Sequence, residues 1–202
     1  MFSRQALALS WKTVRPYFVF SIILFFAAMV VGGTPNGATG YILDQIKNIQ
    51  ELAQQAQNSD HPQTAMFWII FERNLTATIT TMYMGIAAGI FPLFTMAING
   101  MVLGFMFGTL ADRGENVAAL IVKGILPHGI LELPALFLAS GFGLLLGVSM
   151  IKGLFGSLFG KTDPWALFIR SLKGTVPALI LLIVLLFLAA VIESTVTYSL
   201  MS

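Results

Sequence analysis

The sequence predicts an all-α, polytopic membrane helix bundle of about five transmembrane spans. Two observations favour this fold class. Hydrophobic residues make up 57% of the 202 positions and charged residues only 10%, with a mean hydropathy of +0.86. Apolar windows long enough to cross a bilayer also recur along the chain. This balance excludes a soluble globular domain, and the length suits a single integral membrane domain over residues 1–202.

The first predicted span lies near residues 16–33 and follows Arg4, Lys12 and Arg15. Basic residues before an apolar run are typical of a signal peptide and of a first anchor. We expect an anchor, because no Ala-x-Ala-like cleavage site follows the run. The same hydropathy criterion predicts further spans. They lie near residues 65–90, 92–111, 130–151 and 175–198.

The stretch between the third and fourth predicted spans is irregular. Residues 117–126 would form a helix of only about 15 Å, too short to cross a bilayer. Pro127 and Gly129 follow it directly, and Pro134 comes soon after. Because proline removes a backbone donor and disturbs the preceding turn, we expect a short re-entrant or interfacial helix that is broken at Pro127–Gly129.

Two segments outside the spans have an amphipathic pattern. Near residues 41–57, apolar side chains recur every three or four positions among polar ones, which predicts an amphipathic helix. It either rests its apolar side on the bilayer or on the protein's own spans, or it docks a partner. A second amphipathic segment near residues 153–165 is predicted to lie at the inner membrane interface.

The distribution of basic residues predicts the orientation. Lysine and arginine collect before the first span and again between residues 152 and 173, and such clusters are typical of cytoplasmic flanks. With five crossings of the cytoplasmic membrane, the amino terminus is then inside and the carboxyl terminus outside. The net charge of +2 does not indicate a nucleic-acid partner, and the absence of cysteine excludes disulfides and thiolate sites.

Glycines recur at helical spacing on the second and third predicted spans. Small residues on one stripe let two membrane helices approach closely and pack by dispersion forces. The stripe joins helices within one chain or, alternatively, joins two chains in a homodimer. The residues concerned are Gly85, Gly89, Gly100, Gly104 and Gly108.

A polar constellation lies inside this apolar sequence. A charge near the bilayer centre costs about 2.5–3.5 kcal/mol and is tolerated mainly where it faces a bundle interior, a partner or water. We therefore expect the polar residues of the central spans to form one outward-opening cluster. Its predicted members are Glu72, Asn74, Asn99, His128 and Glu132. Arg73 is expected to point elsewhere, and Glu193 to reach water at the outer end of the last span.

Three roles remain open for this cluster. It satisfies backbone groups freed by the helix break, it holds a divalent metal ion through His128, Glu132 and Glu72, or it binds a translocated solute or a lipid headgroup. The sequence contains no Ser-His-Asp arrangement, no His-Glu-x-x-His motif and no phosphate loop. We therefore expect a protein that is not an enzyme and has no cofactor beyond this possible metal.

Several motifs resemble a known family. Asn74, the run Ala97-Ile98-Asn99-Gly100, and Leu126-Pro127-His128-Gly129 followed by Glu132-Leu133-Pro134 resemble the stage II sporulation protein M family of integral membrane proteins. The resemblance covers about residues 65–150, and the five-span layout extends it loosely along the chain. It implies a role in engulfment during endospore formation, where the name-giving member anchors peptidoglycan-degrading enzymes at the septal membrane. The family also occurs in organisms that do not form spores.

Three functional hypotheses follow. The first is a nonenzymatic membrane scaffold that recruits peptidoglycan hydrolases through the helix near residues 41–57 and packs its glycine-lined spans in membrane lipid. The second is a transporter or lipid-handling protein that uses the polar cluster beside a broken helix. The third is an intramembrane metal-dependent hydrolase that uses His128, Glu132 and Glu72.

Overall fold

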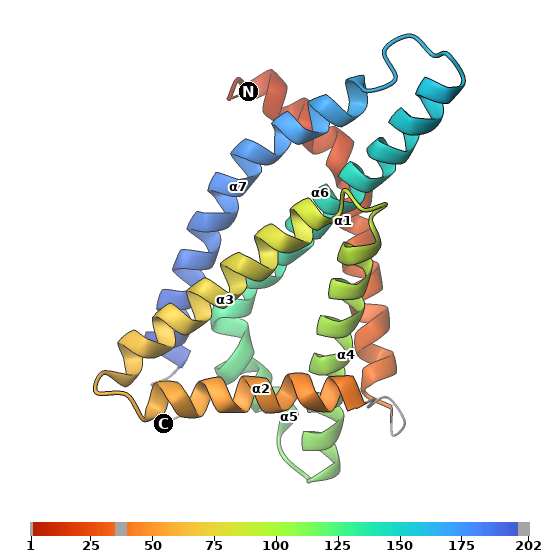
Figure 1. The fold of residues 1–202 in the computed structure, drawn as a ribbon. Coiled ribbons are helices and arrows are strands. Elements are labelled where there is room, and N and C mark those ends of the chain that lie inside the picture. The colour runs from red at the N-terminus through yellow and green to blue at the C-terminus, as the bar shows by residue number, and fades with distance from the viewer. Residues whose placement is uncertain (1, 35–39, 198–202) are drawn as a thin grey trace.

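The computed structural model describes residues 2–34 and 40–197, and every regular element in these ranges is a helix (Figure 1). In chain order the helices are α1 (Arg4–Gly32), α2 (Gly40–Gln57), α3 (Pro62–Met84), α4 (Ile90–Asp112), α5 (Val117–Leu120), the π-helical η1 (Ile121–Ile125), α6 (Leu126–Leu158), α7 (Ala166–Ile192) and the π-helical η2 (Glu193–Thr197). The predicted all-α membrane bundle is confirmed.

Four helices within the described ranges are long and apolar enough to cross a membrane. They are α1, α4, the continuous helix Val117–Leu158 and the helix Ala166–Val196. α3 occupies the place of the predicted span near residues 65–90 but falls outside this group. Its polar run Glu72-Arg73-Asn74 and its threonines lower its hydropathy below that of a typical span.

α3 and α4 form a helical hairpin (Figure 1). The chain reverses at residues 85–89, where Ala88 and Gly89 have φ angles of 57° and 75°. This turn packs directly on the middle of α6. A Cβ atom on Gly85 would collide with the backbone of Gly143, and one on Gly147 would collide with Ala88 and Gly89. Glycine is therefore required on both sides of this contact.

The glycine stripe of α4 packs against α1 within the same chain. A Cβ atom on Gly104 would overlap the backbone of Met29, and one on Gly100 would overlap Phe25. Gly32 faces Met101 in the same way, and Gly108 lies against Gly33. The stripe therefore brings the backbones of α1 and α4 together, as expected for small residues in membrane helices.

α6 is the central helix of the bundle and packs against α1, α3, α4 and α7. It contributes Ala135, Ala139, Phe142 and Leu145 to the larger apolar core, whose other buried members come from α1, α3 and α7. Phe137 forms a second core with Phe25 of α1 and Met96 of α4. Because α6 is fixed on several sides, side chains along it have well-defined positions.

The predicted helix break at Pro127–Gly129 is wrong. α6 begins at Leu126 and runs through Pro127, Gly129 and Pro134 without interruption. Pro127 belongs to the first turn after a π-helical segment of the continuous helix Val117–Leu158, where the regular hydrogen-bond ladder is already interrupted, so its missing N–H is tolerated. The irregularity lies just before it, in the π-helical turn Ile121–Ile125. The amphipathic segment predicted near residues 153–165 is not a separate element, since α6 continues to Leu158.

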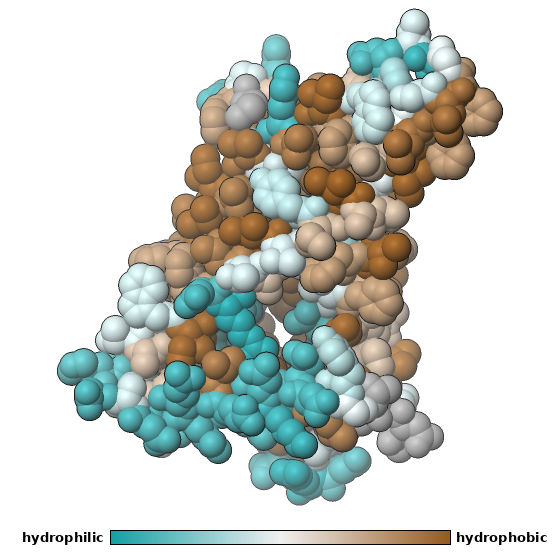
Figure 2. All heavy atoms as spheres, in the orientation of Figure 1, coloured by the Kyte–Doolittle hydropathy of each residue, from teal (hydrophilic) through white to brown (hydrophobic). Residues whose placement is uncertain are grey.

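α2 occupies the place of the predicted amphipathic helix and lies across one end of the bundle, against α3 and α4 (Figure 1). Its Ile42 and Ala56 are buried. Figure 2 shows a broad hydrophobic surface over the middle of the molecule and a hydrophilic surface at the α2 end. At the opposite end, Arg170 of α7 donates a hydrogen bond to Thr13 of α1.

Candidate functional site

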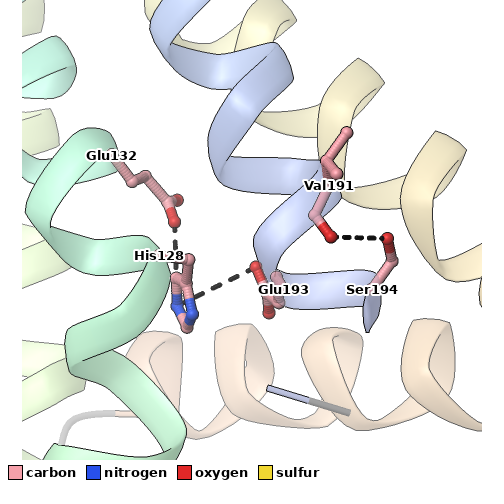
Figure 3. A network of polar contacts seen from close by, with 5 residues as sticks. All are labelled: His128, Glu132, Val191, Glu193 and Ser194. Carbon is pink, nitrogen blue, oxygen red and sulfur yellow. Dashed lines mark hydrogen bonds and ion pairs between the residues drawn. The ribbon is translucent and has the colours of Figure 1, made fainter. Parts of the chain in front are cut away.

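Three ionisable side chains converge near the α2 end of the bundle (Figure 3). His128 and Glu132 are one turn apart on α6, and Glu193 begins η2 at the end of α7. The Nε2 atom of His128 is 3.9 Å from Oε2 of Glu132 and 3.8 Å from Oε2 of Glu193. Figure 3 shows the imidazole between the two carboxylates. Segments more than 60 residues apart in the sequence thus meet at one point.

These side chains are largely withdrawn from the surface. The exposed fraction of the side chain is 12% for His128, 27% for Glu132 and 28% for Glu193. All three residues line a cavity of about 570 Å³, whose other lining residues come mainly from α2, α3, α4 and α6. The hydrophilic residues that line it are Gln45, Arg73, Asn74, Asn99, His128, Glu132 and Glu193.

The wall opposite α6 supplies amide and guanidinium groups. The Asn74 side chain hydrogen-bonds with the Glu132 carboxyl group, and Arg73 is close enough to interact with it electrostatically. Asn99 of α4 donates a hydrogen bond from Nδ2 to the carbonyl oxygen of Thr95 at 2.8 Å. That bond fixes the orientation of the Asn99 amide beside the cavity.

Both π-helical turns of the described chain flank the three converging groups. η1 ends at Ile125, three residues before His128, and η2 starts with Glu193 itself. The two turns also contact each other. Because π-helical turns rotate the following side chains relative to a regular α-helix and are frequent at functional sites, they account locally for the direction in which His128 and Glu193 point.

The structure brings together four of the five predicted cluster residues. Asn74, Asn99, His128 and Glu132 line one cavity, whereas Glu72 is exposed on α3 and does not line it. The prediction of Glu72 as a third metal ligand is therefore wrong. Arg73 was expected to point away, yet it lines the cavity. Consecutive residues on a helix are about 100° apart, so turning Arg73 and Asn74 inward leaves Glu72 outside.

Glu193 is the site residue that sequence reasoning missed. It was expected to reach water at the outer end of the last span, but it lies beside His128. A signal was present, because a lone carboxylate that follows a long apolar run inside a predicted span needs a partner. Its proximity to His128 in the folded chain could not be predicted from the sequence.

This arrangement has two chemical capabilities. One imidazole nitrogen and two carboxylates form a donor set that suits a divalent cation. The guanidinium and amide groups across the cavity suit an oxygen-rich or anionic ligand. The arrangement contains no nucleophile-and-base pair of the serine or cysteine type among the cavity-lining residues.

Comparisons with known proteins identify the family of the chain. The family model described as stage II sporulation protein M matches residues 17–198. An uncharacterised protein of Methanocaldococcus jannaschii is 30% identical over 129 residues, which cover 64% of this chain and 54% of the relative. The chain thus spans about half the length of that relative. No solved structure matches the chain. This membrane protein belongs to the stage II sporulation protein M family.

Proposed function

We propose that this protein is a nonenzymatic scaffold in the cytoplasmic membrane that holds peptidoglycan-degrading enzymes at its outer face. One observation carries the proposal. α2 is held across one end of the bundle by its apolar side, so its polar side is free to meet a partner (Figure 2). Family membership supports the proposal, because the name-giving member is regarded as such an anchor.

The polar side of α2 has the character of a protein-binding surface. Its exposed residues include both charges and amides, in a row along the helix. They are Asp44, Lys47, Asn48, Glu51 and Gln55. Such groups contribute steering and specificity more than affinity. The partner therefore needs complementary charges and further contacts nearby.

The charge distribution supports an outward-facing α2. Lys152, Lys161 and Arg170 belong to the end of the bundle opposite α2, and positively charged flanks favour the cytoplasmic side. α2 and the start of η2 both border the cavity at the other end. An outer location gives α2 access to the compartment that contains the cell wall.

A pull-down with charge-reversed α2 tests the scaffold. The variant carries Asp44→Lys and Glu51→Lys, and a matched control carries Lys152→Glu and Lys161→Glu at the other end; all four positions are exposed. We expect recovery of purified peptidoglycan hydrolases from detergent extracts to fall at least about fivefold for the α2 variant alone, because opposed like charges suppress association. Equal recovery with both variants would count against this surface.

The cavity favours a second candidate function, which is lipid or solute handling. A cavity of about 570 Å³ whose lining combines Arg73 and two asparagines with many apolar side chains suits a lipid headgroup. Mass spectrometry of lipids that co-purify with the wild type and with Arg73→Gln tests it. Stoichiometric lipid in the wild type that is lost in the variant would support lipid handling, whereas no retained lipid in either would remove it.

A further inference from the structure

We infer that His128, Glu132 and Glu193 form a binding site for a divalent transition metal ion, with Zn²⁺ as the best-fitting ion. The site goes beyond the scaffold proposed above and does not depend on it, since a metal ion would bind here whether or not α2 docks a partner. Each of the three residues offers one ligand atom, and these atoms all lie within 4.8 Å of one another.

The separations suit ligands that share an ion. Nε2 of His128 is 3.9 and 3.8 Å from the two carboxylate oxygens, which is longer than a direct hydrogen bond of about 2.7–3.2 Å. A tetrahedral Zn²⁺ with bond lengths of about 2.0–2.2 Å holds its ligand atoms about 3.4 Å apart. To reach coordination, the two separations from His128 would have to shorten by about 0.4–0.5 Å, and the separation between the two carboxylate oxygens, which is at most 4.8 Å, by up to about 1.4 Å.

The charges also suit a divalent ion. Two ionised glutamates inside the membrane-spanning part of a bundle are costly unless a partner balances them. A neutral imidazole, two carboxylates and one divalent cation sum to zero charge. Imidazole with carboxylate is a ligand combination typical of zinc, manganese and iron, whereas calcium and magnesium prefer oxygen ligands alone.

The site is built rather than a chance cluster of acids. His128 and Glu132 share one face of α6 because they are four residues apart. η1 and η2, which contact each other, set the direction of the chain at His128 and Glu193. Asn74 hydrogen-bonds with Glu132, the kind of outer-shell contact that orients a ligating carboxylate.

The cavity leaves a coordination position open. Three protein ligands with an open fourth position are typical of zinc sites that bind water or a further ligand. Arg73, on the same cavity wall as Asn74, adds a positive charge within reach of whatever occupies that position. The metal site is therefore accessible from the cavity.

Metal analysis of the purified full-length chain tests the inference. The protein is prepared in detergent with an affinity tag that lacks histidine, stripped with a chelator, loaded with Zn²⁺, and analysed by elemental mass spectrometry after dialysis. We expect about one bound Zn²⁺ per chain and, at a Zn²⁺ concentration about 100-fold above Kd, a rise in Tm of about 5–10 °C. Co²⁺ in place of Zn²⁺ should show visible absorption typical of a four-coordinate ion.

Matched variants separate this site from adventitious binding. Glu193→Gln removes a ligand at nearly constant shape and should weaken Zn²⁺ binding at least about 100-fold, because loss of an outer-shell contact alone costs about 10–100-fold. Glu72→Gln, on the exposed side of α3, and His61→Ala, on an exposed loop, should bind as the wild type does. Glu132→Gln provides a second ligand variant if Glu193→Gln aggregates.

Two results would overturn the site. One is a wild type that retains no ion and shows no Zn²⁺-dependent change in Tm, which would leave only a hydrogen-bonded network. The other is equal Zn²⁺ binding by Glu193→Gln and Glu72→Gln. Failure here is distinct from failure of the scaffold, because the α2 charge reversals should leave Zn²⁺ binding unchanged and the metal assay contains no partner.

Discussion

Replacing Gly104 by alanine should separate α1 from α4. The added Cβ atom would overlap the carbonyl group of Met29 and lie 2.9 Å from the backbone nitrogen of Gly33. Both neighbours are backbone atoms, so no side-chain rotation relieves the collision. The two helices must move apart along the whole stripe, where Gly32 also faces Met101 and Gly100 faces Phe25.

The expected loss of stability follows from the size of that movement. Forcing one extra methyl group into a close-packed contact typically costs about 1–3 kcal/mol. We expect the upper part of this range, because the clash involves backbone on both sides and disturbs neighbouring glycine contacts. For a chain of this size, about 3 kcal/mol corresponds to a fall in Tm of about 6–12 °C.

Thermal unfolding of the detergent-purified protein, followed by intrinsic tryptophan fluorescence, measures the effect. Gly40→Ala is the control, because a Cβ atom there meets nothing within 4 Å. The fall in Tm should be independent of protein concentration, since the contact lies within one chain. A Gly104→Ala variant with the same Tm as the control would refute close packing of α1 on α4. A fall in Tm that depends on protein concentration would place the stripe at a dimer interface.

Two further predictions concern polar groups. Asn74→Ala should weaken Zn²⁺ binding about 10–100-fold while leaving its stoichiometry near one, because it removes the hydrogen bond with Glu132 but no ligand. Calorimetric titration measures this affinity. An unchanged affinity would contradict the role of Asn74. Ser21→Ala should lower the free energy of unfolding by about 0.6–1.7 kcal/mol, because the buried Ser21 Oγ donates to Ser140 Oγ at 3.1 Å. The Ser21→Ala/Ser140→Ala double variant should cost less than the sum of the single variants, and strict additivity would show that the bond contributes nothing.

Part of the site could be predicted from the sequence, because a polar side chain inside a membrane span is costly unless it faces the bundle interior, a partner or water. His128 and Glu132 were placed on one helical face by their spacing of four, and the structure keeps them there. Asn74 and Asn99 were expected beside them and line the same cavity. The cost of a polar side chain in lipid is large enough to direct His128, Glu132 and Asn74 toward the interior, whereas Asn99 lies on the exposed side of the cavity.

The other site residues depended on helix rotation, which hydropathy does not encode. Glu72 and Arg73 are adjacent in the sequence, so turning α3 by one residue exchanges which of them faces the cavity. The packing of α3 on α6 through Gly85 and Gly143 fixes that rotation. Glu193 reaches His128 only because η2 and η1 meet at the same end of the bundle.

The sequence by itself determined that this chain is an all-α membrane protein with an apolar bundle and a small set of interior polar groups, because the hydrocarbon core of the bilayer penalises exposed polar atoms. Only the tertiary structure decided that Glu193, rather than Glu72, completes the group around His128, and that the helix runs through Pro127. These outcomes depend on the rotation of α3 and α7 against α6. That rotation is set by contacts between segments that lie far apart in the chain.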